Sequence, residues 1–121
     1  MEDRFSQQLK KGVLELLVLQ LICRGPTYGY ELISQLNRRS GGFFTLKEGT
    51  LYPILYRLED GGLIRSVWQQ QPGRQTPRKV YTATQAGLEE NAQRLALWDA
   101  FRTAVDTLCQ KGELEHEQET N

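Results

Sequence analysis

Residues 47–62 read KEGTLYPILYRLEDGG, and the rest of the chain is arranged around this stretch. Its apolar residues recur at the i, i+3, i+4, i+7 spacing that gathers side chains on one face of a helix: Leu51, Ile54, Leu55 and Leu58. The other face carries short, rigid or cationic side chains suited to phosphates and base edges: Thr50, Tyr52, Pro53, Tyr56 and Arg57. The stretch therefore predicts a DNA-recognition helix docked on a core, although alone it also fits an ordinary amphipathic helix.

Proline and glycine set the expected ends of this helix. An interior Pro53 would lose a backbone hydrogen bond, whereas in the first turn its missing N–H costs little. We therefore expect the recognition helix over residues 50–60, ended by the pair Gly61-Gly62. A strand then opens at Leu63-Ile64, and a helix that runs into a hairpin is the layout of a winged helix.

Two further helices are predicted before the recognition helix. Residues 5–23 form a first helix with an apolar surface wider than one face, so we expect cover from a second molecule as well as from its own domain. Gly25-Pro26 ends it, and Thr27 is a candidate N-cap for a second helix over residues 28–39. The second helix and the recognition helix together describe a helix-turn-helix.

A strand hairpin with a polar loop is predicted next. β-branched and aromatic residues are frequent at 63–68 and 79–84, and Pro72-Gly73 and Pro77 interrupt the segment between them. The loop over residues 69–78 contains Arg74 and Arg78 and no acidic residue. We interpret it as a wing that follows phosphates or enters a minor groove, with a merely solvated loop as the alternative.

A long last helix is predicted over residues 85–110, with Thr84 as its N-cap. Its apolar residues form one stripe, and at 1.5 Å per residue it extends about 39 Å, more than a small winged helix covers. We therefore expect a homodimer built on the first and last helices, through Leu14, Leu17, Leu21, Leu95, Trp98, Phe101, Val105 and Leu108. Residues 1–84 would form the winged helix-turn-helix domain, and residues 111–121 a disordered acidic tail.

Charge is unevenly distributed along a chain whose net charge is zero. Residues 1–88 contain twelve Lys or Arg and seven Asp or Glu, whereas residues 89–121 contain three and eight, which gives +5 and −5. No acidic residue lies between Asp60 and Glu89, although Arg65, Arg74, Arg78 and Lys79 do. This segment is the most basic surface that the chain can offer to a polyanion.

Residues for catalysis or metal binding are scarce. The single histidine, His116, lies in the acidic tail, and Cys23 and Cys109 lack the spacing of metal ligands. We therefore expect no enzyme, no metal and no cofactor. Two isolated cysteines fit a reducing cytoplasm and a packing role, with a redox sensor as the alternative. The longest apolar run is too short to span a bilayer, so no membrane anchor is expected.

The motifs of the chain resemble those of the PadR family of transcriptional regulators, in its short subtype with one terminal dimerisation helix. The most specific motif is GTLYPIL at 49–55 followed by RLE at 57–59; the others are GVLELLVL at 12–19, YGYEL at 28–32, GGLI at 61–64 and RKVY at 78–81. The resemblance implies a mainly α fold with a small β-hairpin, and a homodimeric repressor that leaves a palindromic operator when a small molecule binds. The chain departs from the family pattern at Gln69-Gln70-Gln71 and Pro77, which lie in the wing.

We assign the contacts with double-stranded DNA as follows. Thr50, Tyr52 and Pro53 approach the major groove, while Lys47 and Arg57 approach the backbone. The wing supplies Arg74, Arg78 and Lys79, and Tyr28 is a further candidate for a phosphate contact. The alternative function is a winged-helix module that binds protein, which would have no need for an acid-free recognition surface.

Trp98 lies on the apolar stripe of the last helix and has two interpretations. It is either an anchor of the dimer interface or, with its symmetry mate, one wall of a cavity for a flat aromatic effector. The second interpretation comes from the resemblance, because a multidrug-responsive member of the family stacks drugs on a tryptophan at this distance from the Thr84 and Gly87 motif.

Overall fold

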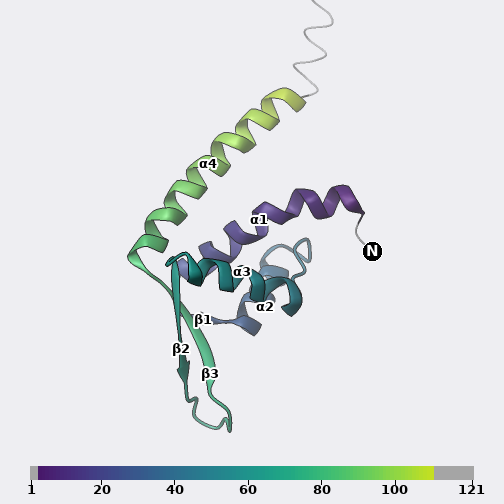
Figure 1. Ribbon diagram of the computed structural model, residues 1–121. Helices are drawn as coiled ribbons and strands as arrows, with labels where there is room; N and C mark the ends of the chain where they lie inside the picture. Colours follow the sequence, from purple (N-terminus) through teal and green to yellow (C-terminus); the bar gives the residue numbers. More distant parts are fainter. Residues whose placement is uncertain (1–2, 111–121) are drawn as a thin grey trace, which may run out of the picture. The chain divides into compact units, whose positions relative to one another are not determined.

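The computed structural model describes residues 3–110, which form four helices and a three-stranded antiparallel sheet (Figure 1). The predicted fold class, a mainly helical winged helix-turn-helix, is confirmed. The elements are α1 (Arg4–Cys23), β1 (Thr27–Tyr28), α2 (Gly29–Arg39), α3 (Glu48–Asp60), β2 (Ile64–Gln69), β3 (Arg78–Ala83) and α4 (Gln85–Cys109). The expected acidic tail at 111–121 lies outside the described residues.

The helix α3, predicted as the recognition helix, begins two residues before the predicted start. The amides of Thr50 and Leu51 already donate to the carbonyl oxygen of Lys47, at 3.0 and 2.9 Å. Pro53 therefore lies beyond the first turn. Because proline has no backbone N–H, the carbonyl of Gly49 lacks the helical hydrogen bond that residue 53 would otherwise donate. Both residues are exposed, so water can hydrate this carbonyl.

The hydrophobic core lies where α1, α2 and α3 meet the sheet. The predicted inner face of α3 is confirmed, since Leu51, Ile54, Leu55 and Leu58 are all at most 3% exposed. Further fully buried side chains come from the other elements: Val18, Leu19, Ile22, Leu32 and Ile64. The predicted interface residues Leu14, Leu17 and Leu21 are partly buried and pack against this same core.

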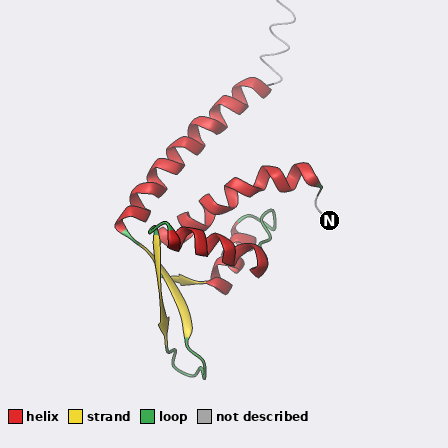
Figure 2. Cartoon of the chain, viewed as in Figure 1, coloured by secondary structure: helices red, strands yellow, loops and turns green. Residues whose placement is uncertain are grey.

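The sheet contains one strand more than the predicted hairpin. β1 pairs with β3, with Thr27 opposite Tyr81 and Tyr28 opposite Val80, and β3 also pairs with β2 along its whole length (Figure 2). Thr27 is therefore a buried strand residue, and the prediction that it caps the second helix is wrong. The N-cap of α2 is Tyr28, whose side chain makes no capping hydrogen bond.

Hydrogen bonds of Thr84 hold the start of α4 in place. The Thr84 hydroxyl donates to the carbonyl oxygen of Gly62 at 2.6 Å and accepts from the amide of Gly87 at 3.0 Å. The Thr84 amide also donates to the Leu63 carbonyl at 3.0 Å. Thr84 thus caps α4, as predicted, and ties the helix to the turn between α3 and β2.

The described residues divide into two compact units, one that ends at Asn91 and one that begins at Ala92. In the second unit, the apolar stripe of α4 is exposed along its length, including Leu95, Phe101, Val105 and Leu108. None of the helices within residues 3–110 combines the length and the hydrophobicity that a membrane span requires.

Candidate nucleic-acid interface

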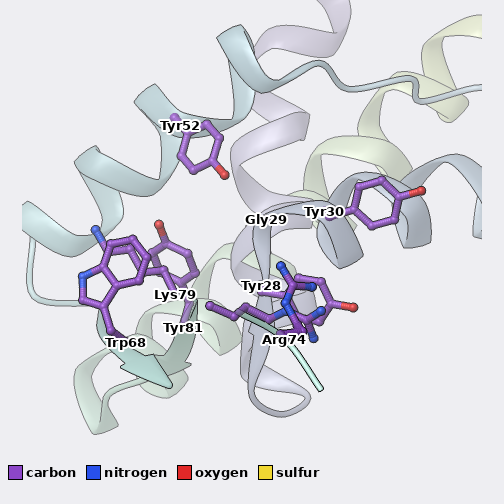
Figure 3. Close-up of a pocket in the computed structure, with 9 residues that line it drawn as sticks. Tyr28, Gly29, Tyr30, Tyr52, Trp68, Arg74, Lys79 and Tyr81 are labelled. Carbon is purple, nitrogen blue, oxygen red and sulfur yellow. The ribbon is translucent and has the colours of Figure 1, made fainter. Parts of the chain in front are cut away.

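A hollow of about 550 Å³ joins α3, the start of α2 and the hairpin, and we call it the wing hollow. None of the residues that line it is acidic: Tyr28, Gly29, Tyr30, Tyr52, Trp68, Arg74, Arg78, Lys79 and Tyr81. Figure 3 shows Trp68, Lys79 and Tyr81 grouped below Tyr52, with Tyr28 and Arg74 to one side of them. The fold therefore brings together five of the nine residues predicted to contact DNA, among them the three cations of the wing.

Two of these cations lie against aromatic rings. The Arg78 guanidinium carbon is 3.8 Å from the centroid of the Tyr28 ring, which connects the wing to the start of α2. The Lys79 ammonium lies 5.7 Å from the Trp68 ring and 5.8 Å from the Tyr81 ring. Such cation–π contacts restrict the two side chains while they keep their charge, so both are held in place before a ligand arrives.

Tyr81 forms a neutral wall of the wing hollow. Burial, followed by the nearby Tyr52, Glu59 and Tyr56, raises the pKa of its hydroxyl to about 12. A tyrosine of ordinary pKa is already protonated at neutral pH, and the raised pKa keeps this hydroxyl from adding a negative charge beside Lys79 in more alkaline solution as well. The basic character of the hollow is preserved as a result.

The Tyr52 side chain projects from α3 toward the start of α2. Its side chain is 39% exposed, and its hydroxyl oxygen lies 2.7 Å from the point that a Cβ on Gly29 would occupy. Residue 29 must therefore lack a side chain for Tyr52 to keep this position. Part of the Tyr52 ring is committed to packing, and the exposed remainder is available to a ligand.

The other four predicted DNA contacts, on α3 or at its N-cap, lie outside the wing hollow. Lys47 and Thr50 are exposed and line a second hollow beside α1, while Pro53 is exposed and lines neither hollow. Arg57 forms an ion pair with Glu15 of α1, with 3.2 Å between Nε and Oε1. In the same motif, Glu59 accepts a hydrogen bond from the Ser66 hydroxyl at 2.7 Å. The RLE motif thus connects α3 to α1 and β2, a structural role that the sequence did not indicate.

Three aromatic residues of the wing hollow were missing from the predicted site. Tyr30 and Trp68 are 75% and 65% exposed, and Tyr81 is buried at the back of the hollow. The available signal for Trp68 was its position directly before the predicted wing loop at 69–78. Tyr30 lies two residues after Tyr28 in the same YGYEL motif, and this proximity to a predicted contact was its available signal.

The predicted dimerisation and effector residues of the second unit lie along α4. Trp98 is half-buried, and its ring stacks on that of Phe101 with 6.0 Å between centroids and 23° between planes. Among residues 3–110, no group of three or more His, Cys, Asp or Glu side chains is arranged to hold a metal ion.

Cys23 is a packing residue at the base of α4. Its thiol lies 3.8 Å from the carbonyl oxygen of Gly87, and burial raises the pKa of that thiol. A raised pKa lowers the thiolate fraction on which redox reactivity depends. This environment favours the packing role of Cys23 over the redox alternative.

Comparisons with known proteins are consistent with this geometry. The family model described as "Transcriptional regulator PadR-like family" matches residues 18–93. The chain is 33% identical over 78 residues to the negative transcriptional regulator PadR of Bacillus subtilis, a match that covers 64% of this chain and 42% of that protein. A transcriptional regulator of Mycobacterium tuberculosis is 33% identical over 81 residues, which cover 67% of this chain and 71% of that protein. The crystal structure of a PadR-like transcriptional regulator from Bacillus cereus is 36% identical, with a TM-score of 0.75 over 85% of this chain and 97% of that one.

Proposed function

Because the chain belongs to the transcriptional regulator PadR-like family, we propose that it is a cytoplasmic, homodimeric repressor that binds a palindromic DNA operator. The observation that supports this most is the acid-free wing hollow, in which Tyr52 of the recognition helix and three cations of the wing face one space. A polyanion that meets both elements at once is the ligand that such a surface favours.

The predicted contacts take distinct roles in this proposal. Thr50, Tyr52 and Pro53 present the exposed side of α3 to base edges in the major groove. Arg74, Arg78 and Lys79 bind phosphates along the wing, and Lys47 binds the backbone at the start of α3. Tyr28 acts mainly through its stack on Arg78, which holds the wing cation in position. Arg57 reaches the backbone while its Nε remains paired with Glu15.

Sequence discrimination is tested at Tyr52. The affinities for a duplex carrying the promoter region of the protein's own gene and for a random duplex of equal length are measured by fluorescence anisotropy. Tyr52→Ala is expected to narrow the ratio of the two affinities by about tenfold or more, since one lost base contact in each half-site costs about 1 kcal/mol or more. Tyr52→Phe is the matched control, because it keeps the ring and should keep most of the ratio. Absence of DNA binding by the wild type would contradict the proposed function.

The homodimer is proposed to form through the exposed stripe of α4, which packs against the first helix of a second copy. Its support is the exposure of several large apolar side chains at helical spacing, including Leu95, Phe101, Val105 and Leu108. A contiguous apolar surface of this kind on a small protein indicates a binding surface. The partly buried Leu14, Leu17 and Leu21 of α1 would complete the interface.

Charge substitutions at two positions of α4 test this dimer. Val105→Glu places a carboxylate on the stripe, and an uncompensated buried charge is expected to weaken dimerisation about 100-fold or more, by roughly 3 kcal/mol. Ala96→Glu is the control, because the exposed residue 96 lies about 180° from residue 105 around the helix axis and should leave the dimer intact. Sedimentation equilibrium measures both constants, and equal dimerisation of the two variants would argue against the interface.

A small aromatic effector is the last part of the proposal, with Trp98 as its stacking residue. Its support is the Trp98–Phe101 pair, which already presents two parallel aromatic rings on α4. A ligand that binds one arrangement of the two recognition helices better than another would change operator affinity by that difference.

Tryptophan fluorescence separates this effector site from the wing. Planar aromatic compounds should quench the emission of the wild type and of Trp68→Phe, but not that of Trp98→Ala. If a compound releases DNA while Trp98 emission stays constant, the effector binds elsewhere and Trp98 is only an interface residue.

A further inference from the structure

A second hollow lies between α1 and the segment that leads into α3, and we call it the lysine hollow. Its volume is about 640 Å³. Three lysines contribute to its lining, and none of its lining residues is acidic: Gln7, Lys10, Lys11, Leu14, Phe44, Thr45, Leu46, Lys47 and Thr50. Glu48 follows Lys47 directly but does not line the hollow. The other charged residues between positions 7 and 50 sum to zero net charge. The three lysines of the hollow therefore form a local positive surface.

Contacts at the edge of the lysine hollow hold one of these ammonium groups in place. Lys10 Nζ donates a hydrogen bond to the carbonyl oxygen of Phe43 at 2.9 Å. The same nitrogen lies 4.5 Å from the centroid of the Phe43 ring and 5.7 Å from that of Phe44. These contacts restrict a flexible side chain in advance, which lowers the ordering cost when an anion binds.

The two hollows lie on opposite sides of the recognition helix. Thr50 lines the lysine hollow and Tyr52 lines the wing hollow. At 3.6 residues per turn, a separation of two residues corresponds to a rotation of about 200° around the helix axis. The helix therefore has cations of the wing on one side and cations of α1 on the other.

A helix in the major groove has a phosphate strand on each side, because the groove is only about 12 Å wide. The wing hollow supplies cations for one of these strands. We propose that the lysine hollow binds the backbone phosphates of the other strand, through Lys10, Lys11 and Lys47. This inference rests on the proposed function, and it adds α1 to the elements that contact DNA.

Replacing Lys11 tests the proposal, because this side chain is exposed and lines the hollow. The full-length Lys11→Gln protein is compared with the wild type on a labelled random-sequence duplex and on the promoter duplex between 50 and 200 mM salt. Loss of one phosphate contact per protomer should reduce the slope of log affinity against log salt by about 1.8. The wild-type-to-variant affinity ratio should then fall about twelvefold across this salt range, equally for both duplexes.

Arg39→Gln is the matched control, since it removes one exposed positive charge that lines neither hollow. A slope for Lys11→Gln that equals the slope for Arg39→Gln would overturn the proposal while leaving the proposed function intact. An effect on the promoter duplex alone would also overturn it, because phosphate contacts carry no sequence information. Failure of the wild type to bind either duplex would overturn the proposed function itself, and the lysine hollow with it.

Discussion

Replacing Arg74 and Arg78 together by Ala is expected to flatten the salt dependence of DNA binding by about 3.6 in log–log slope. Each protomer loses two phosphate contacts, so the proposed dimer loses four, and each contact releases counterions when it forms. Before any contribution from Lys10 and Lys11, four or five cations per protomer give the wild type a slope of about −7 to −9. The wild-type-to-variant affinity ratio should therefore fall about 150-fold between 50 and 200 mM salt.

The loss should be the same for the promoter duplex and for random DNA, because wing phosphates position the protein without reading bases. The double variant Arg24→Ala, Arg39→Ala provides the comparison at equal net charge, since both residues are exposed and line neither hollow. Its slope should stay close to that of the wild type. An equal reduction of the log–log salt slope in the two double variants would show that the wing does not bind phosphates. A wild-type affinity that does not depend on salt concentration would show the same.

Replacing Gly87 by Ala is expected to destabilise the fold by about 3 kcal/mol or more, although Ala is the better helix former. A Cβ at this position would overlap the carbonyl oxygen of Leu63 and lie 2.9 Å from its carbonyl carbon. Both atoms belong to the backbone, and the Leu63 carbonyl also accepts the Thr84 amide. The neighbour is therefore unable to rotate away as a side chain would, and the turn or the helix must shift.

Urea unfolding at one fixed protein concentration measures this loss, since the proposed dimerisation would make apparent stability depend on concentration. Gly49→Ala is the matched control: it also lies in a helix, but nothing occupies the 4 Å around its added Cβ. That variant should gain about 0.5 to 1 kcal/mol from helix propensity. If Gly87→Ala were as stable as the wild type, the close approach of α4 to Leu63 would not hold in solution.

The elements whose evidence is local could be predicted from the residues alone. The spacing of Leu51, Ile54, Leu55 and Leu58 predicted both the recognition helix and its buried face, because helix geometry repeats every 3.6 residues whatever lies nearby. Turn residues marked the hairpin, and the acid-free segment between Asp60 and Glu89 indicated where the wing would carry its charge. The resemblance to the PadR family then implied a function for each of these elements.

The way in which these residues combine could not be predicted, since contacts between distant segments have no periodic trace in the sequence. It paired Thr27 with Tyr81 as a third strand, and it joined Arg57 to Glu15 across 42 positions. The need for glycine at 87 arises from the Leu63 backbone, which approaches from another element. In the same way, Lys10 and Lys11 are unremarkable in the sequence, and packing of α1 beside the start of α3 turns them, with Lys47, into one basic surface.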